Sequence, residues 1–232
     1  MEQIFFSLRI TGLLALLGAL LYAIGDVLLL ASKASSEHYP RLKPFAKLLS
    51  DAEKMVVVPP GRLMWGALLG VFATPLVIIG YWQVYQGLAG ANPSLALATV
   101  SLFAIGSVIG AFVHGTFYYM GEYVQALNKV EDGSQAVIAE MIGRHRKVLI
   151  ITYAPVMILI LVASILFSIL VASGQTAFPV WMAALNPVLI IIAWLLLKRV
   201  LPQFVRDWTE GAGFNIAFLI FFACTTIILW NG

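Results

Sequence analysis

Long apolar stretches, separated by shorter polar segments, dominate the pattern of residues along the chain. A membrane-spanning helix needs about 20 consecutive apolar residues, because it rises about 1.5 Å per residue through about 30 Å of hydrocarbon. Six segments meet this requirement, at residues 8–31, 63–85, 94–119, 148–172, 180–197 and 214–230. The pattern therefore predicts an all-α protein, a polytopic transmembrane bundle of six helices in which residues 1–232 form a single domain.

Composition supports a membrane protein over a soluble one. The chain is 61% hydrophobic and only 11% charged, whereas about a quarter of the residues of a soluble domain are charged. No soluble core could bury this much apolar surface, so we expect membrane lipids to be its main partner. The net charge of +3 is then no sign of nucleic-acid binding, and none is predicted.

Lysine and arginine residues gather in the loops between alternate predicted spans. These are Lys33, Arg41, Lys43, Lys47, Lys54 and Arg62 in the first such loop, Lys129, Arg144, Arg146 and Lys147 in the second, and Lys198, Arg199 and Arg206 in the third. Only Arg9 lies on the opposite side. Because positively charged loops stay in the cytoplasm, we expect both termini on the outer side.

Two of the positively charged loops have a helical pattern of their own. PRLKPFAKLLSDAEKM (40–55) predicts an amphipathic helix. Its apolar face would hold Leu42, Phe45, Leu48, Leu49 and Met55, and Lys43, Lys47 and Lys54 would lie mostly away from that face. The helix would lie either at the lipid headgroups or packed as a soluble helix under the bundle. SQAVIAEMIGRHRK (134–147) predicts a second short helix, with Ser134 as its N-cap, that leads directly into the fourth span.

Small residues and prolines inside the spans predict how the helices pack. The pairs Gly66/Gly70 and Gly106/Gly110 stand four residues apart, a spacing that lets neighbouring helices approach closely. We favour packing within the bundle, and the alternative is a homo-oligomer interface through either pair. Pro75, Pro155 and Pro187 are expected to kink or loosen the second, fourth and fifth spans.

Polar residues that are unusual in a membrane span gather near the cytoplasmic side, given the predicted topology. They are Asp26, Arg62, His114, Tyr118, Glu122 and Asn215. Ionisable groups at membrane depth cost free energy, and most are paired or functional. His114 lies about two turns inside the third span, and Glu122 lies roughly 12 Å further along the helix axis, so they cannot share one proton or metal ion directly.

Several roles remain open for these residues. His114 either hydrogen-bonds a neighbouring helix or takes part in acid–base chemistry, for which histidine is suited near neutral pH. Asp26 forms an ion pair with Arg62, or acts as a base or as an orienting partner of His114. Glu122 is also explained by solvation at the headgroups, and Tyr118 by anchoring at the interface.

Other chemistries are disfavoured by what the sequence lacks. No second histidine or cysteine stands at metal-ligand spacing from His114, so no metal or other cofactor is predicted. Ser107 lies about 10 Å from His114 along the helix axis, too far for a nucleophile and its base. No glycine-rich phosphate loop and no H-E-x-x-H motif occurs.

Short motifs resemble an uncharacterised bacterial family of six-span membrane proteins, a domain of unknown function. They are GDVLLL (25–30), RLMWGALLG (62–70), YWQVY (81–85), GSVIGAFVHGTF (106–117), NPVL (186–189) and GAGFNIAFLIFF (211–222). The resemblance implies a fold and the bacterial inner membrane, but no activity. The Gly25-Asp26 pair is also similar to one at a helix end of lysoplasmalogenase-type membrane hydrolases.

These observations lead to a functional hypothesis. We expect a polar pocket facing the cytoplasm, which binds or modifies an amphipathic lipid or isoprenoid. His114 and Asp26 are the candidate catalytic residues. The candidate substrate-binding residues are Arg62, Tyr118, Glu122 and Asn215. The alternatives are a small secondary transporter and a structural or partner-binding membrane protein without chemistry.

Overall fold

The computed structural model describes residues 2–230, and every regular element within that range is helical. The long helices are α1 (Glu2–Leu30), α3 (Pro60–Leu88), α4 (Pro93–Lys129), α5 (Asp132–Ala172) and α8 (Gly213–Trp230). The shorter elements are η1 (Ser36–His38), η2 (Lys43–Phe45), α2 (Ala46–Leu49), η3 (Ser50–Val57), η4 (Val180–Ala184), α6 (Pro187–Lys198) and α7 (Gln203–Trp208). The all-α prediction is confirmed.

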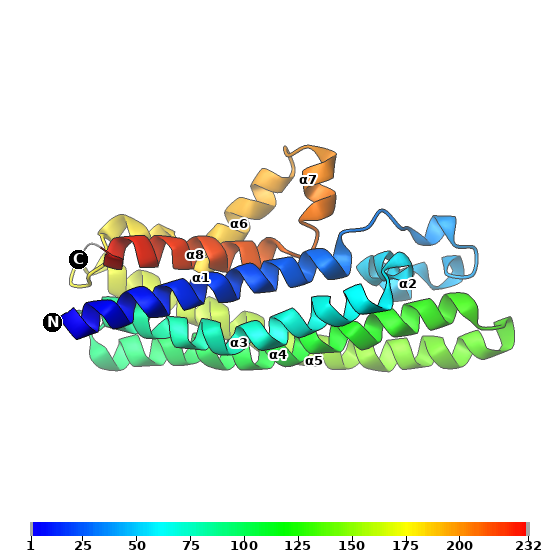
Figure 1. Cartoon of the computed structure of the whole chain (residues 1–232), viewed down its shortest axis with the longest axis horizontal. Coiled ribbons are helices and arrows are strands. Elements are labelled where there is room, and N and C mark those ends of the chain that lie inside the picture. The colour runs from blue at the N-terminus through cyan, green and yellow to red at the C-terminus, as the bar shows by residue number, and fades with distance from the viewer. Residues whose placement is uncertain (1, 231–232) are drawn as a thin grey trace.

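The five long helices are each long and apolar enough to cross a membrane. They run side by side, and both ends of the described chain lie at the same end of the bundle (Figure 1). There the Arg9 guanidinium donates a hydrogen bond to the Trp230 carbonyl over 3.0 Å and lies over its ring. The architecture is that of a multi-pass membrane protein.

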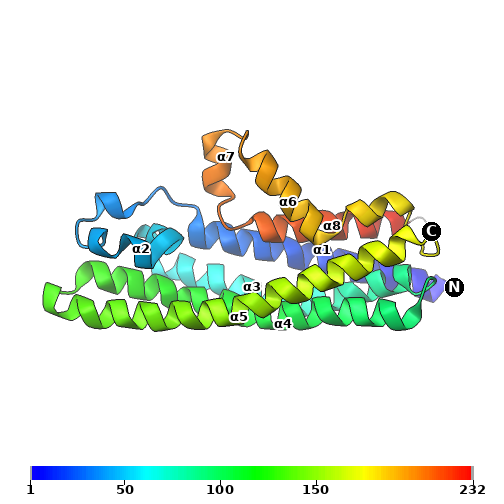
Figure 2. The same ribbon diagram turned by 180° about the vertical axis from the view of Figure 1, so that it is seen from behind.

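The predicted span at residues 180–197 is not one continuous helix. It is divided into η4 and the 12-residue α6, because Pro187 starts a new helix and Asn186 caps it. The Asn186 side-chain oxygen accepts a hydrogen bond from the Leu189 amide at 3.0 Å. Twelve residues rise only about 18 Å, and α6 leans away from the bundle towards α7 (Figures 1 and 2).

Glycines set the closest helix contacts. α1 packs on α3 and α8, while α4 packs on α3 and α5. A Cβ atom at Gly66 would come within 2.8 Å of Leu29, and one at Gly70 within 2.4 Å of the His114 ring. Gly66 and Gly70 therefore face neighbouring helices of the same chain. Pro75 and Pro155 lie inside α3 and α5 without ending either helix.

At the end opposite the termini, α4 and α5 continue as a hairpin beside the η1–η3 segment (Figure 1). Short helical turns of that segment bury Leu42, Leu49 and Met55 in a second apolar cluster. The segment is held to α4 by Gln125, whose side-chain amide donates to the Met55 and Val58 carbonyls at 3.1 and 2.6 Å. The residues expected on the apolar face of 40–55 therefore pack against the protein.

The helix predicted in the next loop is the first part of α5. α5 begins at Asp132 and continues without a break through the span. The N-cap position is Glu131, which makes no side-chain capping hydrogen bond, so the prediction of Ser134 as the cap is wrong. α4 ends at Lys129 and α5 begins at Asp132, so Asp132 and Gly133 are already helical before Ser134.

Candidate functional site

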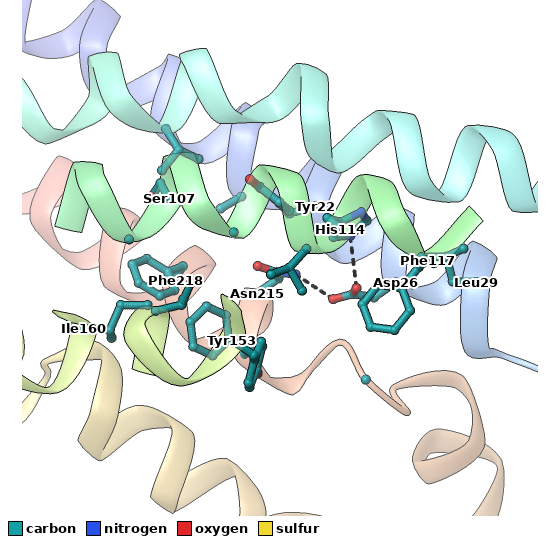
Figure 3. Close-up of a pocket in the computed structure, with 18 of the residues that line it drawn as sticks. Tyr22, Asp26, Leu29, Ser107, His114, Phe117, Tyr153, Ile160, Asn215 and Phe218 are labelled. Atoms are coloured by element: carbon teal, nitrogen blue, oxygen red, sulfur yellow. Dashed lines mark hydrogen bonds and ion pairs between the residues drawn. The ribbon is translucent and has the colours of Figure 1, made fainter. Parts of the chain in front are cut away.

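A cavity of about 230 Å³ lies inside the bundle between α5 and α8. α1, α3 and α4 supply the rest of its wall, and most of its lining is apolar (Figure 3). On α4 the lining runs from Gly106 to Phe117, which corresponds to roughly 16 Å along the helix axis. The cavity is thus an elongated, mainly apolar space.

One end of the cavity is polar. The Asp26 carboxylate lies between two partners there, with Oδ1 at 3.2 Å from His114 Nε2 and Oδ2 accepting a 2.6 Å hydrogen bond from Asn215 Nδ2. The three residues come from α1, α4 and α8, and all three line the cavity (Figure 3). We call them the Asp26 cluster. Asp26 and His114 are only 8% and 6% exposed.

The helix packing makes room for the imidazole of His114. Gly70 on α3 lies directly against this ring, and a Cβ atom at Gly25 would lie 3.0 Å from it. The ring of Tyr22 meets it edge-on, with 5.4 Å between the ring centroids. The motifs around Gly25 and Gly70 therefore serve to seat a histidine between α1 and α3.

The hydrogen bonds of His114 determine where its protons lie. Nδ1 is 3.1 Å from the Ala67 carbonyl oxygen. This oxygen can only accept, so Nδ1 carries a proton. A hydrogen bond between Nε2 and the Asp26 carboxylate requires one further proton between these two atoms. With that proton, the pair is either imidazolium with carboxylate or imidazole with carboxylic acid, and in both forms it is neutral overall.

Arg62 is not part of the cavity wall. Its Nε donates to the Leu28 carbonyl at 2.7 Å, and its Nη2 donates to the Val27 and Ala31 carbonyls at 3.0 and 2.8 Å. Val27 and Leu28 belong to the last turn of α1, and Ala31 directly follows the helix, so these carbonyls lie where a helix leaves its backbone acceptors short of partners. Arg62 thus caps α1, and Asp26 pairs with His114 and Asn215 instead.

Tyr118 and Glu122 also lie outside the cavity lining. The Tyr118 ring packs edge-on against Tyr119, with 5.3 Å between centroids, and borders the second apolar cluster. One carboxylate oxygen of Glu122 is buried without a hydrogen-bond partner. The structure therefore brings together three of the six predicted site residues, namely Asp26, His114 and Asn215.

Comparison with known proteins identifies the family. A family model described as a family of unknown function (DUF6796) matches residues 1–231. The chain belongs to this family. The resemblance to an uncharacterised family is thereby confirmed, while no comparison supports the likeness to lysoplasmalogenase-type hydrolases. No curated protein and no solved structure matches the chain.

Two further hydrogen-bonded pairs lie along the cavity of this DUF6796 member. The Tyr22 hydroxyl bonds the Thr74 hydroxyl, and Thr74 in turn donates to the Gly70 carbonyl at 3.0 Å. Further along, the hydroxyls of Tyr81 and Ser107 are 3.1 Å apart. Sequence reasoning missed both pairs, although Tyr22 stands four residues before Asp26 and so shares its helix face.

Tyr153 marks the side of the cavity nearest the bundle surface. It lines the cavity from α5 and is 45% exposed. Within residues 2–230, no group of three or more His, Cys, Asp or Glu side chains lies close enough to hold a metal ion. The site therefore has hydrogen-bonding side chains at one end, and the rest of its lining is apolar.

Proposed function

We propose that this protein binds an amphipathic lipid or isoprenoid within the membrane. The head of the ligand lies at the Asp26 cluster, and its chain lies in the apolar part of the cavity between α5 and α8. Within the pair, the proton shared by His114 and Asp26 is the one available for acid–base chemistry on a bound head group.

The observation that carries the proposal is a buried ionisable pair, Asp26 and His114, inside an apolar bundle and at the edge of a mainly apolar cavity. Burying ionisable groups in a membrane costs free energy even when they are paired. Simple helix packing would be served as well by apolar side chains of similar volume. A polar end on an otherwise apolar cavity matches a ligand with a polar head and an apolar chain.

The side of the cavity towards the membrane supports access for such a ligand. α8 packs on α1 and α6, and α5 packs on α4 and η4. The cavity lies between α5 and α8 near Tyr153, Val156 and Asn215, while further along the two helices the Phe167 and Phe221 rings meet, with 5.2 Å between their centroids. Gly110 lines the cavity, and a Cβ atom added there would meet nothing within 4 Å. A lipid chain therefore finds space beside Gly110 without displacing a side chain.

The placement of this site in the cytoplasmic leaflet of a bacterial inner membrane is part of the proposal. Both ends of the described chain lie at the same end of the bundle (Figure 1). A sixth crossing, completed by η4 with α6, would give the even number of crossings that this arrangement requires. Before the start of α8, Glu210 pairs with Lys54 of η3 at 3.4 Å and with Lys198 at the end of α6 at 3.3 Å. These pairs bring two of the positively charged loops together, and the proposal places both on the cytoplasmic side by the positive-inside rule.

A cavity-filling substitution tests the proposal. Gly110→Leu places a side chain in the cavity, and Gly61→Leu is its matched control, because Gly61 also has nothing within 4 Å and lies outside the cavity. We expect mass spectrometry of the purified protein to find a co-purified amphipathic molecule with the wild type and with Gly61→Leu, and roughly tenfold less with Gly110→Leu. Equal amounts in the two variants would contradict the proposal.

The alternative functions have less support. A transporter needs a path to the outer side, where Gln83 is fully buried and bonded to Thr225 and Thr226 at 3.3 and 3.0 Å. A partner-binding role through glycine pairs would need them on the surface, whereas Gly66 and Gly70 contact helices of their own chain. A homo-oligomer through Gly106 and Gly110 would have to cover the cavity wall.

A further inference from the structure

We infer that the residue that meets the ligand is Asp26 and not His114, and that the ligand carries a neutral hydroxyl head group. The inference rests on the proposed function and specifies its substrate class as a long-chain or isoprenoid alcohol. His114 then acts as a positioning residue. It holds the Asp26 carboxylate in place through Nε2 and balances its charge, without contacting the ligand.

His114 has no nitrogen left for a ligand. Its Nδ1 faces the Ala67 carbonyl at 3.1 Å, and its Nε2 faces Asp26 at 3.2 Å. Gly70 lies directly against the ring on the α3 side. This reverses the order of a catalytic triad, in which the histidine stands between the carboxylate and the reacting group.

Asp26 keeps open positions towards the cavity. A carboxylate offers about four lone-pair sites, and the bonds from His114 and Asn215 occupy two of them. The side-chain oxygen of Asn215 accepts no hydrogen bond from the described residues, and Figure 3 shows it turned away from Asp26. The free positions of Asp26 and of the Asn215 oxygen are acceptors, while the second N–H of Asn215 and the Tyr153 hydroxyl, which also lines the cavity, can donate. A hydroxyl head group, which both donates and accepts a hydrogen bond, matches this set.

An anionic head group does not fit this set of side chains. Among the described residues that line the cavity, none is lysine or arginine. Arg62 lies outside the lining and already donates to the Val27, Leu28 and Ala31 carbonyls at the end of α1. A phosphate or carboxylate would thus meet the acceptor oxygens of Asp26 and Asn215 without a cation to neutralise it.

A cationic head group is disfavoured for a different reason. The Asp26–His114 pair is neutral overall when its hydrogen bond is formed, so an added ammonium would be buried without a compensating charge. A hydroxyl loses far less hydration on burial and donates one hydrogen bond to the carboxylate. The remaining lining, which includes Val113, Phe117, Val156 and Ile160, is suited to a hydrocarbon chain.

Three probes with one chain and different heads test the inference. Dodecan-1-ol, dodecyl phosphate and dodecylamine are titrated separately into the full-length protein in detergent micelles, and the midpoint of thermal unfolding is followed. We expect the alcohol to raise the midpoint at concentrations at least tenfold lower than the other two. Tighter binding of the phosphate or of the amine would overturn the inference.

Substitutions assign the effect to individual residues. Asp26→Asn is expected to weaken the alcohol at least tenfold, and Asn215→Leu serves as a second variant should Asp26→Asn not fold. His114→Gln retains an amide donor but no charge, so the preference should move from the alcohol to the amine. A merely structural role for His114 would weaken all three probes equally, and that result would overturn the positioning role.

Different results would contradict the proposed function and the hydroxyl head group. If none of the probes binds and Gly110→Leu also leaves co-purified amphiphile unchanged, the proposed function itself is wrong. If the probes bind and Gly110→Leu abolishes their binding, but the phosphate or the amine binds most tightly, the cavity is a binding site and only the hydroxyl head group is wrong.

Discussion

Two buried polar clusters tie α8 to the rest of the bundle, and they differ in what surrounds them. In the Asp26 cluster, Asn215 reaches from α8 to a carboxylate on α1, and all the members border a cavity. In the other, which we call the Gln83 cluster, Thr225 and Thr226 of α8 meet Gln83 of α3. Gln83 and Thr225 are both 0% exposed, and Thr226 is 4% exposed.

The comparison separates two uses of polarity inside a membrane bundle. The Gln83 cluster contains only neutral groups, which satisfy each other and touch no described cavity. Such interhelical hydrogen bonds contribute about 0.6 kcal/mol each on average. The Asp26 cluster contains an ionisable pair and leaves acceptor positions open, which packing alone does not require. Charge combined with open space is therefore the better sign of a binding site.

The largest expected effect comes from the glycine that seats His114. In Gly70→Leu, the added Cβ would lie 2.4 Å from the imidazole, so the ring must leave its position between α1 and α3. Overpacking of a tight contact costs about 1–3 kcal/mol, and displacement of the buried ring from Asp26 adds to that cost. We expect a loss of about 3 kcal/mol or more in the free energy of unfolding, measured by denaturant titration in micelles. Gly110→Leu, which enters open space, should change it by less than about 1 kcal/mol.

The next effect separates stability from binding within the Asp26 cluster. Removal of one partner from a buried ion pair costs about 3–5 kcal/mol, whereas apolar replacement of both is often nearly neutral. His114→Leu should therefore destabilise the protein by about 3 kcal/mol, and the double variant Asp26→Leu/His114→Leu should recover most of that loss. Neither should bind dodecan-1-ol. Recovery of binding in the double variant would show that the pair does not contact the ligand.

The smallest effect is expected in the Gln83 cluster. Gln83→Leu removes the neutral hydrogen bonds of the Gln83 side chain with Thr225 and Thr226, at a cost of about 1 kcal/mol in the free energy of unfolding. Binding of the alcohol probe should remain within about twofold of the wild type, because the cluster borders no part of the cavity. A tenfold loss of probe binding in Gln83→Leu would show that the two clusters are coupled, and would erase the distinction drawn between them.

Much of the fold could be predicted because membrane helices need long apolar stretches. Five predicted spans correspond to long apolar helices of the structure. The segment at 180–197 differs because a count of apolar residues does not register that Pro187 lacks a backbone N–H and fits the first turn of a helix. With Asn186 capping the new helix, the chain breaks there although every other residue of the segment is apolar.

The site could be predicted in part, and the reason lies in topology. Asp26, His114 and Asn215 lie at similar depths in their helices, so alternating helix directions bring them to one level. Arg62 lies at the same level, yet its partners are backbone carbonyls of α1. Charge matching along a sequence considers only side chains, so it pairs Arg62 with Asp26 and overlooks the carbonyls at a helix end.

The Arg62 cap has a consequence for the height of the site in the membrane. Two of its three carbonyl partners, Val27 and Leu28, directly follow Asp26 in the chain. α1 cannot slide along α3 by even one residue without losing these bonds, and the same α3 supplies the Ala67 carbonyl that holds His114. The Asp26 carboxylate and the His114 imidazole are therefore both held at a fixed height relative to α3. Thickening or thinning of the surrounding bilayer would shift both together and leave their separation unchanged.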